Sequence, residues 1–244
     1  MTDFGDSHAV PGEYALNAAN ATEAVAGVAA RSRVSVILGG DVAACLYSVR
    51  GLSRLGQVNV LHLGPRPLWG RGADGGPSGV LREVAALDGV GKMVIAGLRG
   101  PAGCGAGGVG LARSRASLLP ARQLIAEGTE PVLRAIAAGT DWFVSLDVAA
   151  LDPAIAPAVE EPSFGGLDYW QVTDLLTGLA ARARVIGIGV FGISPERDHN
   201  FLTSRLAIRL TSNLLGAALR KDLENHGEPL AHPARSARQL AGAR

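Results

Sequence analysis

The sequence predicts an α/β protein of three layers, in which helices cover both faces of a mostly parallel β-sheet. Short runs rich in Val, Ile and Leu alternate with amphipathic, Ala-rich segments along most of the chain, and this alternation is typical of parallel sheets. The length of 244 residues suits a single domain with a sizeable core. Because 48% of residues are hydrophobic and only 5% aromatic, that core is expected to be mainly aliphatic.

Six apolar, β-branched runs bounded by Gly, Asp or Pro are predicted to be the strands. They cover residues 33–38, 58–63, 92–98, 116–119, 143–147 and 184–191. Helices are predicted between them from apolar periodicity and capping residues. They cover residues 14–32, 42–55, 78–87, 129–138, a segment starting at 168, and 199–219. Long Gly- and Pro-rich loops are expected at 64–77 and 100–110.

We expect one domain over residues 1–220 and a mobile, charged and aperiodic tail over 221–244. The net charge of +1 and the pI near 7.9 give no strong field. Nucleic acid and anionic membranes are therefore not favoured as partners. Cys45 and Cys104 show no metal-ligand spacing, and no run approaches the ~20 apolar residues of a membrane span. A reduced, cytoplasmic protein is the expectation.

The stretch from Phe143 to Pro153 is the main candidate for a site. A short apolar run ends at Asp147, and Asp152 and Pro153 follow before a long loop. In a parallel sheet such a run delivers carboxylates to the carboxyl edge, where binding sites are normally built.

This stretch resembles the signature of the ureohydrolases, the family of arginases, agmatinases and guanidinases. Other segments resemble family motifs in the same order: Leu38–Asp41, Val60–Leu68, Gly97–Gly100 and Val185–Pro195. The resemblance implies an arginase-like fold over almost the whole chain. It also implies that the N-terminal part before the strand at 33–38 is shortened, so that either the edge of the sheet is missing or this part is rebuilt. A sheet edge left open would need covering, and a partner subunit is one way to cover it.

The resemblance implies a site of two divalent metals, usually manganese, held by six side chains, with a bridging hydroxide that attacks a guanidinium carbon. Of those ligand positions only Asp147 keeps a ligand, while Asp41 and Asp152 correspond to supporting residues. The ligand positions that lack one are Val42, Gly64, Arg66, Leu68 and Ala149. Two substrate-binding glutamates correspond to Gln171 and Gly192. We therefore expect no metal and no catalytic residue in this chain.

Removal of the metals would leave Asp147 as an unpaired buried charge, which is costly. Arg66 stands at a former ligand position, so one hypothesis is that its guanidinium reaches Asp147 and replaces the metal charge. The alternative is that Arg66 is a solvated loop residue.

The leading functional hypothesis is a non-catalytic subunit assembled with an active ureohydrolase paralogue in a trimer- or hexamer-type complex. The paralogue would hold Mn or Ni and hydrolyse a guanidino compound, such as a guanidine, biguanide or agmatine-type molecule. The alternative is a stand-alone protein whose pocket serves metal-independent chemistry or small-molecule binding.

Four further features have simpler structural interpretations. The Gly-x-Gly-x-x-Gly match at 103–108 is expected to be a flexible loop, and Cys104 lacks activating neighbours. His62 is expected to be a satisfied core histidine. Gln171 is explained as a helix cap, because Asp168 precedes it at capping-box spacing. Trp69 is expected to be exposed in its loop, with a subunit contact as the alternative.

Overall fold

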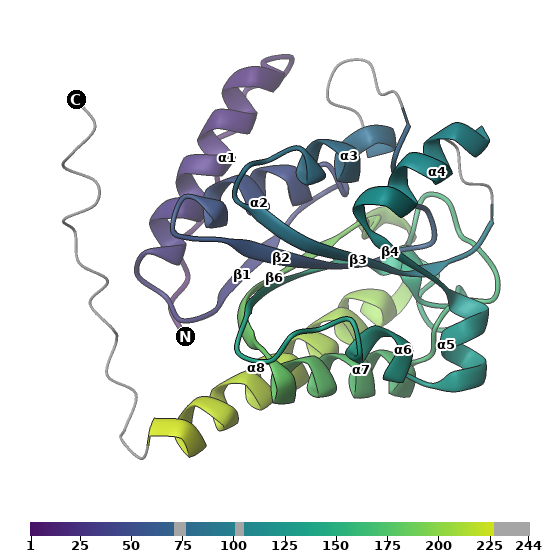
Figure 1. Ribbon diagram of the computed structural model, residues 1–244. Helices are drawn as coiled ribbons and strands as arrows, with labels where there is room; N and C mark the ends of the chain where they lie inside the picture. Colours follow the sequence, from purple (N-terminus) through teal and green to yellow (C-terminus); the bar gives the residue numbers. More distant parts are fainter. Residues whose placement is uncertain (71–76, 101–104, 227–244) are drawn as a thin grey trace.

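A computed structural model describes residues 1–70, 77–100 and 105–226 (Figure 1). It shows one six-stranded sheet in the order β1-β6-β5-β2-β3-β4, and every neighbouring pair is parallel. The strands are β1 (Ser35–Leu38), β2 (Val58–Leu63), β3 (Val90–Leu98), β4 (Ser117–Pro120), β5 (Asp141–Asp147) and β6 (Arg184–Phe191). The predicted three-layer α/β fold with a parallel sheet is confirmed.

Helices cover both faces of this sheet, as Figure 1 shows. One layer holds α1 (Tyr14–Ala29), α2 (Ala44–Ser53), α3 (Val80–Ala85) and α4 (Gly105–Arg115). The other holds α5 (Ala121–Glu127), α6 (Glu130–Leu133), α7 (Tyr169–Arg182) and α8 (Leu202–His226). No helix in the described residues is long and apolar enough to cross a membrane.

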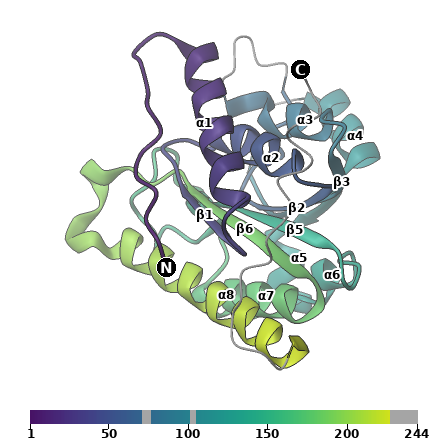
Figure 2. The ribbon, with the colours of Figure 1, turned by 90° about the vertical axis from the view of Figure 1, so that its left-hand side faces the viewer.

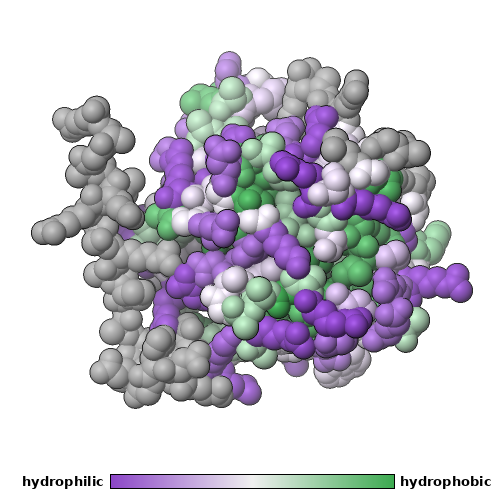
Figure 3. All heavy atoms as spheres, viewed as in Figure 1, coloured by the Kyte–Doolittle hydropathy of each residue, from purple (hydrophilic) through white to green (hydrophobic). Residues whose placement is uncertain are grey.

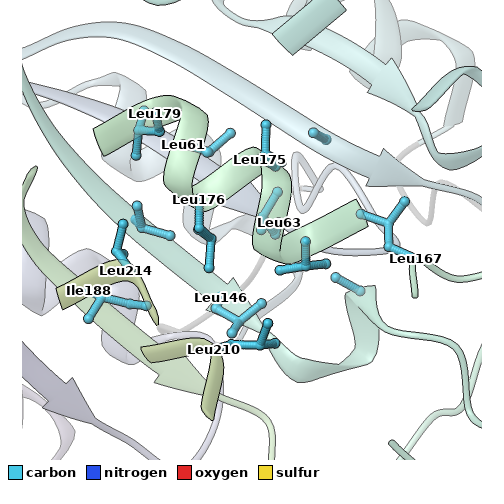
Figure 4. Close-up of a cluster of buried hydrophobic side chains, with 14 of the residues drawn as sticks. Leu61, Leu63, Leu146, Leu167, Leu175, Leu176, Leu179, Ile188, Leu210 and Leu214 are labelled. Carbon is cyan, nitrogen blue, oxygen red and sulfur yellow. The ribbon is translucent and has the colours of Figure 1, made fainter. Parts of the chain in front are cut away.

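The alternation of side chains along the strands divides the core in two. In β2, Leu61 and Leu63 pack with the helices α5 to α8 (Figure 4). Val58 and Val60 of the same strand pack with the layer of α1 to α4. Because β2 is buried along its whole length, it reads as a continuous apolar run, as strands of parallel sheets do. On the face that Figure 3 shows, hydrophilic residues are interspersed with apolar ones.

Several local predictions differ from the structure. The segment expected to be a glycine-rich loop contains α4, which starts at Gly105, and residues 101–104 lie outside the described part. Helix α5 was not predicted. Ser78 lies in a 3₁₀ turn (Pro77–Gly79) and does not cap α3. Helix α8 continues to His226, past the expected start of the tail at residue 221, and residues 227–244 lie outside the described part.

Candidate functional site

The carboxyl ends of the central strands bring most of the candidate positions together. Gly192, directly after β6, donates its N–H to the carbonyl of Gly40 at 2.7 Å, which ties the loop after β1 to the end of β6. A Cβ atom added to Gly192 would lie 2.9 Å from Asp147 Oδ1 at the end of β5. Asp147, Gly192 and the loop that carries Asp41 are therefore neighbours at one edge of the sheet, as predicted.

Asp147 is buried there without an ion-pair partner among the described residues. Its side chain is 6% exposed, and Oδ1 accepts a hydrogen bond from the backbone N–H of Ala149 at 3.0 Å. Burial raises the pKa of the Asp147 carboxyl to about 6, although that hydrogen bond and the charges of Arg66 and Arg99 act in the opposite direction. This carboxyl therefore changes its charge near neutral pH.

Arg66 does not form the expected ion pair with Asp147. Its guanidinium pairs instead with Glu161, in the loop that follows β5. The charge of Arg66 is nevertheless close enough to lower the pKa of Asp147. Arg66 Nε is buried and has no partner among the described atoms. The side chain thus bridges the end of β2 to the loop and is more than a solvated loop residue.

His62 on β2 and Ser145 on β5 form a buried polar pair close to the carboxyl ends of these strands. His62 Nδ1 lies 2.9 Å from Ser145 Oγ, and the Cys45 thiol also contacts Ser145. Burial lowers the pKa of His62 to about 3 and raises the pKa of Cys45 to about 12, so both are neutral at physiological pH. His62 is buried as predicted, but its Nε2 has no partner among the described atoms, so it is only half satisfied.

Gly64 faces the unpartnered nitrogen of this histidine. A Cβ atom at residue 64 would lie 2.4 Å from His62 Nε2, far inside van der Waals contact. The imidazole therefore occupies the space that a side chain at position 64 would need, and the two positions are sterically coupled.

Asp41 and Asp152 hold loop backbones in the described structure. Asp41 accepts the N–H of Ala43 at 2.7 Å. Asp152 accepts N–H groups at 3.0 Å from Ala154, Gly165 and Gly166. These hydrogen bonds lower the pKa of Asp152, with that of Ala154 first among the causes. Both carboxylates therefore stabilise the conformation of loop backbone by accepting N–H groups.

Arg99 stabilises the loops at this edge, a role that was not predicted from the sequence. Its guanidinium donates hydrogen bonds to carbonyl groups from three segments of chain, and burial lowers its pKa. The acceptors are Gly97, Ala149, Ala150, Leu151, Ser163 and Phe164. A signal was present in the sequence, because an arginine directly after a buried apolar strand needs several partners.

The remaining candidate positions are apolar or serve the helices. Val42, Leu68 and Ala149 are buried hydrophobic residues at 6%, 5% and 9% exposure. Gln171 and Asp168 form a reciprocal capping box at the start of α7, which confirms the helix-cap interpretation. Trp69 is 3% exposed and packs in the core, so the prediction of an exposed loop aromatic was wrong.

Comparison with known proteins gives the context for this edge. Residues 1–216 match the arginase family. The chain belongs to the arginase family. Among curated relatives, it is 36% identical over 109 residues to N(1)-aminopropylagmatine ureohydrolase of Thermus thermophilus, covering 43% of this chain and 36% of that protein. It is 34% identical over 88 residues to proclavaminate amidinohydrolase of Streptomyces clavuligerus, covering 36% of this chain and 28% of that protein. The matched part spans about a third of these curated relatives.

Solved structures agree on the fold of this arginase-family chain. The proclavaminate amidinohydrolase structure superposes with a TM-score of 0.79 at 24% identity, covering 88% of this chain and 75% of that chain. Arginase from Bacillus subtilis gives a TM-score of 0.77 at 18% identity, covering 88% and 83%. At these identities the likeness concerns the fold.

The donor set at the carboxyl edge does not fit the two divalent metals that the family resemblance implies. Within the described residues, no three His, Cys, Asp or Glu side chains are grouped so that they could hold a metal ion. Among the positions where the resemblance implies a ligand, Asp147 is the one with a carboxylate, and the charge of Arg66 acts on it. Divalent metals require several oxygen or imidazole ligands converging on one point, and a nearby guanidinium opposes them.

Proposed function

We propose that this arginase-family chain is a non-catalytic subunit that assembles with a metal-bearing member of the same family. The observation that carries the proposal is the composition of the carboxyl edge. Asp147 is the one carboxylate at the six former ligand positions, and the others hold Val42, Gly64, Arg66, Leu68 and Ala149. A hydroxide nucleophile at neutral pH requires metal ions to lower the pKa of bound water, and this edge supplies too few ligands for them.

The fold around this edge is nevertheless intact, which supports a role in an assembly. Arg99 and Asp152 still hold the loop from Ala149 to Gly166 through many backbone hydrogen bonds. A subunit that lacks catalytic residues can still form a subunit interface or contribute part of the wall of the partner's pocket.

The class of substrate in the proposed complex is a guanidino compound. Similar proteins include an agmatinase, a mitochondrial arginase and a guanidinopropionase. In the proposal, Mn or Ni belongs to the partner subunit, the assembly is of trimer or hexamer type, and the complex is cytoplasmic. The buried, neutral Cys45 thiol is compatible with a reducing compartment.

The test compares three samples: this chain, a co-encoded arginase-family homologue with all six ligands, and the two co-expressed. Each is loaded with Mn or Ni and assayed for urea or ammonia release from agmatine, arginine and guanidine. The expected result is no turnover by this chain, and higher or more stable turnover by the co-expressed pair than by the homologue alone. Metal-dependent turnover by this chain alone would contradict the proposal. Turnover by the homologue that stays the same when this chain is present would contradict it as well.

A further inference from the structure

Strand β1 is an edge of the sheet, and no strand of the described residues lies on its outer side. It pairs with β6 alone, and the Gly39 N–H donates to the Val190 carbonyl of β6 at 3.1 Å. Because hydrogen-bonding groups alternate in direction along a strand, the backbone N–H and C=O groups of Val36 and Leu38 point outward. Their side chains are exposed as well, by 38% and 78%.

The sequence of β1 does little to protect this edge. Natural sheets protect an edge with proline or charged residues, or cover it with another segment, because unpaired backbone groups attract strands of other chains. The opposite edge strand, β4, ends at Pro120. The four residues of β1 include neither a proline nor a charge. Protection of β1 therefore has to come from a segment outside the strand.

Residues 1–10, here called the strap, lie along α1 and pass outside this edge. Three side-chain contacts attach the strap, which join Val10 to Asn17 at 2.7 and 2.8 Å, His8 to Asn20 at 3.1 Å, and the Phe4 ring to the Arg31 guanidinium at 5.0 Å. Earlier residues of the strap contact later residues of the helix and its turn, so the strap runs antiparallel to α1. Figure 2 shows the N-terminal trace on the outer side of β1, between the level of α8 and the start of α1.

The strap is itself unsuited to form a strand. The Asp3 carboxylate accepts the Gly5 N–H at 2.9 Å, and Gly5 has a φ of 76°, in the left-handed region. Asp and Gly are also depleted in strands. The strap therefore covers the edge of the sheet without offering a new edge to other chains.

We propose that the strap shields the outer edge of β1, and that its release allows β1 to pair with β1 of a second copy of this chain. Paired strands lie about 4.8 Å apart, so a segment that crosses outside β1 excludes another strand. A two-fold interface uses the same surface of both copies and allows two β1 strands to pair antiparallel. Val36 and Leu38 of each copy would supply the hydrogen-bonding groups and the apolar contacts. This inference is independent of the proposed function.

The test detaches the strap in the full chain and measures self-association by sedimentation velocity over a range of protein concentrations. The variant Phe4→Ala with Asn17→Ala removes two of the three contacts, and alanine at position 17 favours the helix more than asparagine does. Its dimer dissociation constant is expected to be at least tenfold lower than that of the wild type. Addition of Leu38→Lys is expected to abolish this gain, because a charge on an edge strand opposes pairing.

The matched control is Phe164→Ala with Gln123→Ala, which removes an exposed phenylalanine and a helix amide far from β1. Gln123 lies on α5, which packs beside β3 and β4 at the other end of the sheet. The control is expected to associate like the wild type. Hydrogen exchange at Val36 and Leu38 locates the contact, because strand pairing protects their amides. Circular dichroism verifies the folding of each variant.

Three results would overturn the inference. The first is a strap variant that associates no more strongly than the wild type. The second is association of that variant with unchanged hydrogen exchange at Val36 and Leu38, which would place the contact on another surface. The third is a wild-type oligomer that Leu38→Lys dissociates, because β1 would then pair while the strap is in place.

Discussion

At the scale of single residues, the carboxyl edge combines a buried carboxyl with polar groups that are only partly hydrogen-bonded among the described residues. Burial raises the pKa of Asp147 by more than the charges of Arg66 and Arg99 lower it. His62 fills space next to Gly64, and Arg66 reaches Glu161. Each contact involves a position where the family resemblance implies a ligand or its neighbour. Replacement of Gly64 or Arg66 is therefore expected to disturb these contacts.

Asp147 gives a pH-dependent prediction. Its pKa is raised from 3.8 to about 6, so the folded chain holds a proton in this interval that the unfolded chain has released. That stabilising contribution is full below pH 3.8 and is lost as pH rises through about 6. Asp147→Asn is therefore expected to be more stable than the wild type at pH 8, by up to about 3 kcal/mol. The gain should shrink steadily as pH falls from 7 to 4 in urea unfolding.

An exposed carboxylate provides the control for this measurement. Asp174→Asn on α7 removes a charge at an exposed position and is expected to change stability by less than about 0.5 kcal/mol. A gain from Asp147→Asn that does not vary with pH would contradict the assignment of the effect to burial of the carboxylate.

The pair His62 and Gly64 gives a second prediction. Gly64→Ala places a Cβ atom 2.4 Å from His62 Nε2 and is expected to lower the free energy of unfolding by about 1 to 3 kcal/mol. In the background of His62→Ala the same substitution is expected to cost much less. Gly40→Ala is the matched control, because an added Cβ there has nothing within 4 Å. Equal costs of Gly64→Ala with and without the imidazole would refute the coupling.

At the scale of elements, the capping box of α7 explains Gln171 without a substrate. The Asp168 side chain accepts the Gln171 N–H at 2.7 Å, and the Gln171 side chain accepts the Asp168 N–H at 2.9 Å. Asp168→Ala is expected to cost about 1 kcal/mol in thermal or urea unfolding. Gln171→Glu keeps the reciprocal cap and is expected to leave stability nearly unchanged. A large loss from Gln171→Glu would show that the cap does not define the role of this residue.

The elements also show what the sequence could and could not predict. The bounds of β2 and β6 follow directly from apolar runs closed by polar residues or glycine, and both were predicted residue for residue. Helix α4 was missed because its glycines argue against a helix at roughly 1 kcal/mol each, yet Ala112 is buried in the core. Trp69 was misplaced because periodicity does not reveal a loop that folds back into the core. The pairing of Arg66 with Glu161, distant in sequence, required the structure.

At the scale of the whole molecule, an arginase-family fold is retained while its carboxyl edge does not fit two metal ions. The two helical layers and the parallel sheet match the solved relatives. In the proposed complex, catalysis belongs to the metal-bearing partner.

The most direct test of this account is the metal content of the full chain purified alone after incubation with Mn and with Ni, measured by inductively coupled plasma mass spectrometry. An arginase-family protein with all six ligands serves as the positive control. The account predicts far less than one bound metal ion per chain for this protein and about two for the homologue. Two ions bound per chain of this protein would contradict it.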